Sequence, residues 1–172
     1  MTGTISSGRP INGTGQDDEL FGDGVANELN GHRGNDMLLG WGVTYDANAM
    51  WISETPGFAA DEFLRGGVGN DTMAGGGGND VLDGGTGNDN MLGGSGADLF
   101  IHSAGFDTIG DFSAGDGDRI DIPDGTDIAA LIAGATPSQL PYVPGTWLWF
   151  PDGGGVMLAW VAPQDLQAGW FI

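Results

Sequence analysis

Aspartate recurs every nine residues in the middle of this chain, each time two residues after a glycine. From Gly66 to Ile101, four consecutive rows of nine keep glycine at places 1, 2 and 4 and a large apolar residue at place 8. Place 6 of these rows is filled by Asp71, Asp80, Asp89 and Asp98. Carboxylates and backbone carbonyls offer only oxygen donors, and oxygen donors of flexible geometry suit Ca²⁺ better than Mg²⁺ or Zn²⁺. The spacing therefore predicts several bound calcium ions.

The composition raises the need for such cations. The 172 residues include 24 acidic side chains against four arginines and no lysine, which gives a formal net charge of −20, and 35 residues are glycine. Self-repulsion and the backbone entropy of glycine both oppose folding, and multivalent cations would relieve the repulsion. The charge argues against binding to nucleic acid or to an anionic membrane. The absence of cysteine excludes disulfides and thiolate metal sites, and no apolar run approaches the length for membrane insertion.

The elements that position these carboxylates follow from the other places of the row. The same frame runs through residues 13–39, with Asp18 and Asp36 at place 6, and Glu62 and Asp107 extend the frame of the four rows on either side. An apolar residue at place 8, behind a short strand, supplies one core side chain per row. The glycines permit tight turns with positive φ, which can aim backbone carbonyls at a common point.

Residues 13–39 and 62–122 resemble the nonapeptide repeat GGxGxDxUx of hemolysin-type (RTX) calcium-binding proteins, in which U is large and apolar. The resemblance implies an all-β fold, a right-handed parallel β-roll (the RTX solenoid), here with a C-terminal β-hairpin cap. Two rows make one coil in that family, so each row stacks on the row 18 residues earlier and ions lie between the stacked turns.

The resemblance also implies a ligand set. The expected carboxylate pairs are Asp71 with Asp89, Asp80 with Asp98, Asp89 with Asp107, Asp18 with Asp36 and, as a weaker fifth, Glu62 with Asp80. The expected carbonyl donors are Gly67, Gly69, Gly76, Gly78, Gly85, Gly87, Gly94 and Gly96. In the segment that ends the roll, the resemblance favours Asp111 and Asp118 as further ligands over solvated charges. Asn27 carries no charge, so a site there should be weak or absent, and we expect about four to seven ions in total.

The chain divides into five segments. These are an N-terminal tail (1–12), the first repeats (13–39), an aromatic insertion (40–61), the main roll (62–122) and a capping segment (123–172). The insertion is either a displayed binding loop or a loop that folds its aromatics over a small core. In the last segment, Asp127 is expected to N-cap a helix over Ile128–Ala133, and a hairpin should turn at residues 151–155. Its tryptophans either form a carbohydrate- or partner-binding patch or close the open end of the roll.

These observations predict a non-enzymatic protein. The chain contains neither HExxH nor GxSxG, so the peptidase and lipase signatures of RTX relatives are missing. We expect a secreted calcium-binding repeat protein that folds as it binds calcium and has a structural or interaction role. The alternative is an accessory calcium-binding module that supports a polysaccharide-acting enzyme or binds carbohydrate. A carbohydrate or surface partner and self-association both stay open.

An extracellular location is expected from the two ends of the chain. The N-terminus lacks the features of a signal peptide, and the C-terminal tail resembles that of type I-secreted RTX proteins.

Overall fold

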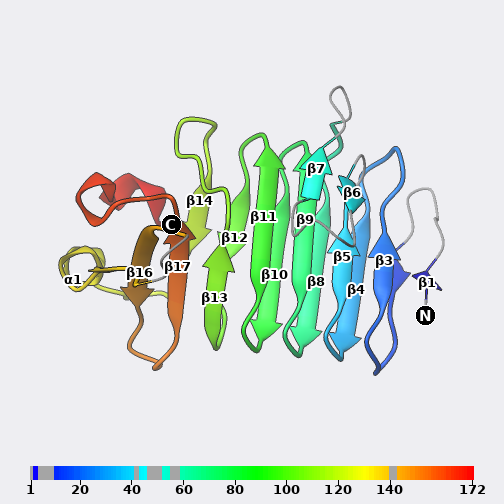
Figure 1. The fold of residues 1–172 in the computed structure, drawn as a ribbon, viewed down its shortest axis with the longest axis horizontal. Helices are drawn as coiled ribbons and strands as arrows, with labels where there is room; N and C mark the ends of the chain where they lie inside the picture. Colours follow the sequence, from blue (N-terminus) through cyan, green and yellow to red (C-terminus); the bar gives the residue numbers. More distant parts are fainter. Residues whose placement is uncertain (1, 4–9, 41–42, 46–51, 55–58, 140–142) are drawn as a thin grey trace.

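Each nine-residue row forms one short strand and one glycine turn, and successive rows alternate between two sheets. The computed structural model describes residues 2–3, 10–40, 43–45, 52–54, 59–139 and 143–172 (Figure 1). Within these residues, one sheet has nine strands and the other six. Residues 18 apart in the main roll are parallel neighbours, as in Met73 beside Met91 and Leu64 beside Leu82. This confirms the all-β parallel roll.

In each of the two sheets, the strands follow one another along the length of the roll. In spatial order, sheet A consists of β1 (Thr2–Gly3), β3 (Glu19–Phe21), β5 (Met37–Leu39), β9 (Thr72–Gly77), β11 (Asn90–Ser95), β13 (Phe106–Ile109), β17 (Gly155–Ala159), β16 (Gly145–Trp149) and β15 (Thr136–Pro137). Sheet B consists of β14 (Arg119–Asp121), β12 (Leu99–Ile101), β10 (Val81–Thr86), β8 (Phe63–Val68), β4 (Glu28–Arg33) and β2 (Ile11–Asn12).

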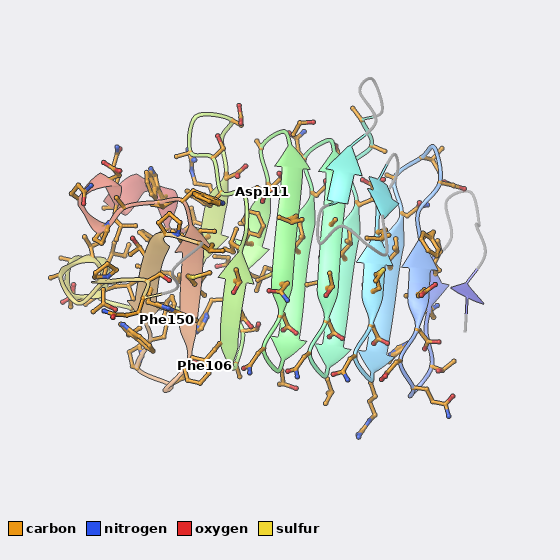
Figure 2. The ribbon with its side chains drawn as sticks, in the orientation of Figure 1. Phe106, Asp111 and Phe150 are labelled. Atoms are coloured by element: carbon orange, nitrogen blue, oxygen red, sulfur yellow. The ribbon has the colours of Figure 1, made fainter. Side chains whose placement is uncertain are left out.

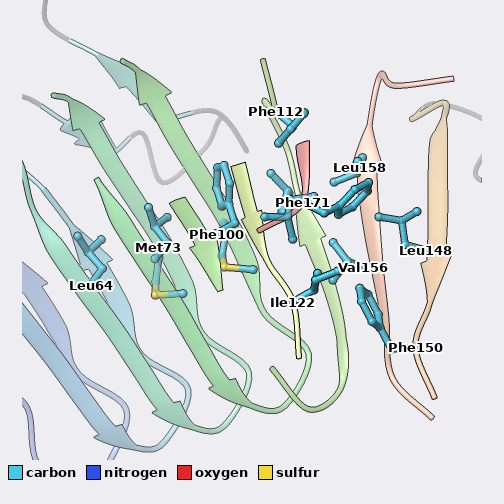
Figure 3. Close-up of a cluster of buried hydrophobic side chains, with 14 of the residues drawn as sticks. Leu64, Met73, Phe100, Phe112, Ile122, Leu148, Phe150, Val156, Leu158 and Phe171 are labelled. Atoms are coloured by element: carbon cyan, nitrogen blue, oxygen red, sulfur yellow. The ribbon is translucent and has the colours of Figure 1, made fainter. Parts of the chain in front are cut away.

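The core is a single file of apolar side chains between the sheets. Every place-8 residue is buried, and all of them belong to one cluster: Leu20, Leu29, Leu38, Leu64, Met73, Leu82, Met91, Phe100 and Ile109. Phe112, Ile120 and Ile122 extend the file into the segment that ends the roll, as expected (Figure 3). One or two side chains per coil make a narrow core, because glycine occupies most of the remaining inward space.

The insertion leaves the stacking of the coils intact. Across it, Leu29 lies beside Leu64 and Leu38 beside Met73, an offset of 35 residues in both sheets where the main roll has 18. The antiparallel strands β6 (Val43–Tyr45) and β7 (Ile52–Glu54) contact β9. Leu39 on β5 and Ala74 on β9 alternate with core residues, so their side chains point to the outer face of sheet A. Both are nevertheless buried. The tryptophans of the insertion, and the side chain of Tyr45, lie outside the described residues.

Both ends of the roll differ from its middle. At the N-terminus, β1 and β2 pair with β3 and β4, so the segment expected as a tail contributes strands to both sheets. At the C-terminus, β16 turns into the antiparallel strand β17, and β17 pairs in parallel with β13, which confirms the hairpin cap.

The remaining C-terminal elements close the end of the roll. Helix α1 (Ile128–Ala133) is N-capped by Asp127 as predicted, and it is followed later by the 3₁₀ turns η1 (Pro163–Asp165) and η2 (Ala168–Trp170). The last residue, Ile172, exchanges backbone hydrogen bonds with Ile120 and Ile122 and covers the edge strand β14. Among the described residues, no helix is long and apolar enough to cross a membrane.

Candidate metal sites

Two ladders of buried side chains, all acidic except Asn27, run the length of the roll, one along each edge. Each member lies at the start of a strand: Asp107 is the second residue of β13, and the others directly precede their strands. Because the strands of sheets A and B start at opposite edges, the ladders are separate (Figure 1). Ladder one, before the strands of sheet A, is Asp18, Asp36, Asp71, Asp89 and Asp107. Ladder two, before those of sheet B, is Asn27, Glu62, Asp80, Asp98 and Asp118. None of these side chains is more than 4% exposed.

In every ladder aspartate except Asp18, one carboxylate oxygen accepts a backbone N–H of the neighbouring coil. The N–H of Asp71 donates to Oδ1 of Asp89 at 2.8 Å, and the N–H of Asp89 donates to Oδ1 of Asp107 at 3.0 Å. The same bond joins Asp80 to Asp98 at 2.8 Å. Asp18 to Asp36 and Glu62 to Asp80 follow the same pattern at 2.9 Å and 2.7 Å. The structure thus brings together every carboxylate pair expected from the 18-residue spacing.

Two further pairs were not expected from the sequence. The backbone N–H of Asp36 donates to Oδ1 of Asp71 at 2.7 Å, across 35 residues of sequence, so ladder one continues past the insertion. The backbone N–H of Asp98 donates to Oδ1 of Asp118 at 3.0 Å, across 20 residues of sequence, and this is the last pair of ladder two. The sequence contains a signal that the frame shifts before the second of these rows: Asp36 and Glu62 are 26 residues apart, one short of three rows. The spacing alone does not say which coil Asp36 contacts.

The second carboxylate oxygen is buried without a hydrogen-bond partner in several members. This holds for Oδ2 of Asp36, Asp71, Asp89 and Asp98. A buried polar atom left unpaired costs about 1–3 kcal/mol, and more when it is charged. The ladders therefore contain a row of buried carboxylate oxygens that accept no hydrogen bond from the described part of the chain.

Glycine at place 1 leaves room for this oxygen. A Cβ on Gly66 would collide with Oδ2 of Asp71 and with the carbonyl oxygen of Gly84 in the next coil. The same collision with the place-6 aspartate would occur at Gly31, Gly75, Gly84 and Gly93.

The glycines at places 2 and 4 meet a different requirement, the positive φ of the turn. All eight predicted carbonyl donors have φ between +91° and +144°. The row at 31–39 has His32 at place 2 instead, with φ +81°, which is an unfavourable conformation for a residue with a side chain.

Burial dominates the electrostatics of the ladders. It raises the pKa of Asp98 to about 7 and the pKa of both Asp71 and Asp107 to about 6. The hydrogen bond from the preceding coil lowers each of these pKa values, while the carboxylates of neighbouring coils raise them. Neighbouring carboxylates that share a buried space without a counter-charge favour either a proton or a cation.

The donor set fits a hard divalent cation. The described residues contain no group of three or more acidic or histidine side chains that could hold a metal, so one ion would receive at most two carboxylates and the rest of its ligands from backbone carbonyls. Paired carboxylates with several carbonyls suit Ca²⁺, which takes six to eight oxygens. The orphaned Oδ2 atoms are the observation that supports this fit.

Some predicted ligands already have protein partners. Asp111, which follows β13 at the end opposite Phe106, accepts the N–H groups of Gly93 and Gly94 at 3.0 Å and 2.9 Å (Figure 2). Both oxygens of Asp118 accept backbone N–H groups, from Asp98 and Ser113. Their roles as calcium ligands stay predictions.

Asn27 is also engaged with a protein partner, and the weak or absent site expected there stays a prediction. Its Oδ1 accepts the N–H of Asp23 at 2.6 Å, and its Nδ2 donates to Oδ1 of Asp23 at 3.3 Å. An amide in this place of the ladder offers no negative charge to a cation.

The residue before the ladder aspartate has a role that the sequence reasoning missed. The N–H of Asn88 donates to Oδ1 of Asn70 at 2.8 Å, and the N–H of Asn70 donates to Oδ1 of Asn35 at 2.8 Å. These bonds run in the direction opposite to those of the aspartates, so adjacent places join each coil to both of its neighbours. The signal in the sequence is the recurrent Asn-Asp pair at places 5 and 6.

Comparison with known proteins agrees with this geometry. The sequence model of the RTX calcium-binding nonapeptide repeat, which spans four copies, matches residues 11–42, 56–91 and 75–109. No curated protein matches the chain.

Two solved structures are similar to this one. The extracellular lipase LipA from Serratia marcescens is 17% identical with a TM-score of 0.48, over 98% of this chain and 40% of the lipase chain. The AlgE6R3 subunit of the Azotobacter vinelandii mannuronan C5-epimerase is 22% identical with a TM-score of 0.49, over 93% of this chain and 80% of that subunit. The chain thus spans well under half the length of the lipase.

The match to the repeat model covers half of the chain, and its frame is the one that sets the two ladders. The chain belongs to the family of RTX calcium-binding nonapeptide repeat proteins.

Proposed function

We propose that this protein is a secreted calcium-binding β-roll that folds as it binds several Ca²⁺ ions between stacked coils, with a structural or interaction role and no catalysis of its own. The observation that carries the proposal is the row of buried carboxylate oxygens without hydrogen-bond partners. Bound calcium would supply the positive charge between neighbouring coils that the protein itself lacks there.

The residues that would hold the ions follow from the ladders. In ladder one, the pairs are Asp18 with Asp36, Asp36 with Asp71, Asp71 with Asp89, and Asp89 with Asp107. In ladder two, the pairs are Glu62 with Asp80, Asp80 with Asp98, and Asp98 with Asp118. In the four rows from Gly66 to Ile101, the place-2 and place-4 glycines would complete the sites with their carbonyls. These junctions agree with the expected total of about four to seven ions.

Calcium binding of this kind is large enough to decide whether the roll forms. An extracellular calcium module has a Kd of about 10⁻⁴–10⁻³ M. At ten times Kd, each site stabilises the folded state by about 1.4 kcal/mol, so four sites contribute about 6 kcal/mol. That is comparable with the whole stability of an ordinary domain, about 5–15 kcal/mol.

Sites of such affinity would fill only where calcium is millimolar, as it is outside the cell. We propose that the chain stays unfolded at the low calcium of the cytoplasm, because the ladder charges repel one another, and folds after export. The tail that resembles the C-terminus of type I-secreted proteins supports this route.

A calcium titration followed by circular dichroism tests the proposal. We expect little β-structure in chelator, a cooperative gain of β-structure at millimolar calcium, and no comparable gain with magnesium, which demands a tighter octahedral geometry. A β-sheet spectrum that does not change when calcium is removed would refute calcium-driven folding.

A second candidate function is an accessory module that binds carbohydrate. Exposed aromatic rings at the C-terminal end of the roll, among them Trp149, favour it.

A further inference from the structure

Three aromatic side chains gather on the outer face of sheet A, at the edge where Phe106 directly precedes Asp107 of ladder one. Trp147 and Trp149 alternate with buried Leu148 on β16, and their indole rings stack with centroids 5.4 Å apart and planes at 21°. Phe106 lies at the start of β13 (Figure 2). Its ring meets each indole edge-on, with centroids 6.3 Å apart. Phe106 and Trp149 are each 46% exposed. We call Phe106, Trp147 and Trp149 the aromatic cluster.

A glycine between the strands lets these rings meet. β17 lies between β13 and β16, and its Gly155 pairs with both Phe106 and Trp149. A Cβ on Gly155 would lie 3.3 Å from Cε3 of Trp149 and 3.4 Å from Cε3 of Trp147, so the indoles lean over the bare backbone at this point.

A hydrogen bond fixes the outer indole. Nε1 of Trp149 donates to Oγ1 of Thr136 on the neighbouring strand β15 at 2.9 Å. The cluster is therefore ordered before any ligand arrives, which reduces the entropy cost of binding.

Polar groups without charge border the cluster. Thr108 and its strand neighbour Asn90 follow on the same outward face of β13 and β11. The arginines of the described residues lie on the strands of sheet B: Arg33, Arg65 and Arg119. Among the described residues, this face therefore offers no cationic side chain to hold a polyanion. Even seven bound Ca²⁺ ions would leave the formal net charge of −20 negative, so the loaded roll repels an anionic polymer or a second copy of the chain. A neutral ligand with apolar ring faces and hydroxyl groups matches both the rings and their border.

We propose that the aromatic cluster binds a neutral oligosaccharide, whose sugar rings stack on the exposed face of Trp149 while its hydroxyls reach Thr108 and Asn90. The inference goes beyond calcium binding, but it rests on the calcium-loaded roll of the proposed function as its scaffold. The four tryptophans of the C-terminal segment do not act together in this account, because Trp170 packs on Phe112 with ring centroids 5.2 Å apart and Trp160 lies at the far end of β17.

Isothermal titration calorimetry in saturating calcium tests the inference. The probes are cellohexaose, chitohexaose and mannohexaose, with an oligoguluronate of equal length as the anionic comparison. We expect the folded protein to bind at least one neutral probe and to bind it more tightly than the oligoguluronate. Trp149→Ala should weaken binding about tenfold or more, which corresponds to about 1.4 kcal/mol. The matched control Trp160→Ala removes a tryptophan that is 61% exposed outside the cluster and should leave the affinity unchanged.

Several results would overturn the inference. These are a folded protein that binds none of the neutral probes, equal affinity of the Trp149→Ala variant, tighter binding of the oligoguluronate, or dimers in sedimentation that Trp149→Ala dissociates. Circular dichroism of the same samples separates the two proposals, because failure of calcium to induce the fold contradicts the proposed function, whereas a folded roll that ignores sugars contradicts only this inference.

Discussion

Asp89→Asn separates the two roles of a ladder carboxylate. Asp89 is the fourth of the five members of ladder one and contributes to two junctions, with Asp71 on one side and Asp107 on the other. The asparagine keeps an Oδ1 that can accept the N–H of Asp71, but it removes the negative charge of the unpartnered Oδ2. The backbone hydrogen bond therefore survives and the calcium ligand is weakened.

The substitution should change stability in opposite directions with and without calcium. At calcium ten times above Kd, loss of two sites lowers the free energy of unfolding by about 3 kcal/mol. In chelator the sign reverses, because burial raises the pKa of Asp89 and the neutral amide avoids the cost of that buried charge. Urea unfolding followed by circular dichroism measures both values, and Asp124→Asn, at an exposed position after β14, is the control that should change neither.

An equal loss of stability in calcium and in chelator would refute this reasoning. It would mean that the carboxylate serves only to hydrogen-bond and pack, and that no cation depends on it.

Three further predictions address protons and glycines. In chelator, β-structure measured by circular dichroism should rise as the pH falls from about 8 to about 5. In the folded roll the pKa of Asp98 is about 7 and that of Asp107 about 6, both above the ordinary value of 3.8. The stability that their protonated forms contribute is therefore present at low pH and is lost as the pH rises through these values. A fall of β-structure on acidification would contradict this prediction. His32→Gly should raise the free energy of urea unfolding in calcium by about 1 kcal/mol, because glycine adopts φ +81° without strain; no gain would mean that the turn is not strained. Gly84→Ala should destabilise the calcium-loaded roll by more than about 2 kcal/mol in the same assay, because the added Cβ would collide with a ladder carboxylate. The control Gly169→Ala should have little effect, because the space around Gly169 is open. Similar losses of stability in both variants would contradict the argument.

The nine-residue frame contains most of what the roll needs, and for that reason much of the fold could be predicted from the sequence. Place 8 gives the core and place 6 gives the ladders, because in a solenoid each residue contacts its counterpart one coil away. The helix N-capped by Asp127 and the hairpin turn at 151–155 were also predictable, since both depend on local sequence signals.

The remaining features depend on contacts that no local pattern encodes. The pairing of Asp36 with Asp71 depends on how the insertion leaves and rejoins the roll, and the spacing gives only a frame slip. Asp111 matches the pattern of a ligand, yet its position in the structure brings it onto the N–H groups of Gly93 and Gly94. The aromatic cluster forms because β17 inserts between β13 and β16, an order of strands that cannot be deduced from the positions of Phe106 and Trp149 in the sequence.

The most direct test of the account is anomalous diffraction from crystals grown in calcium. We predict anomalous difference peaks between neighbouring coils along both ladders, including one between Asp71 and Asp89 within coordination distance of their Oδ2 atoms and one between Asp36 and Asp71 across the insertion. Coils stacked as described here, with no calcium between these carboxylates, would contradict the central claim.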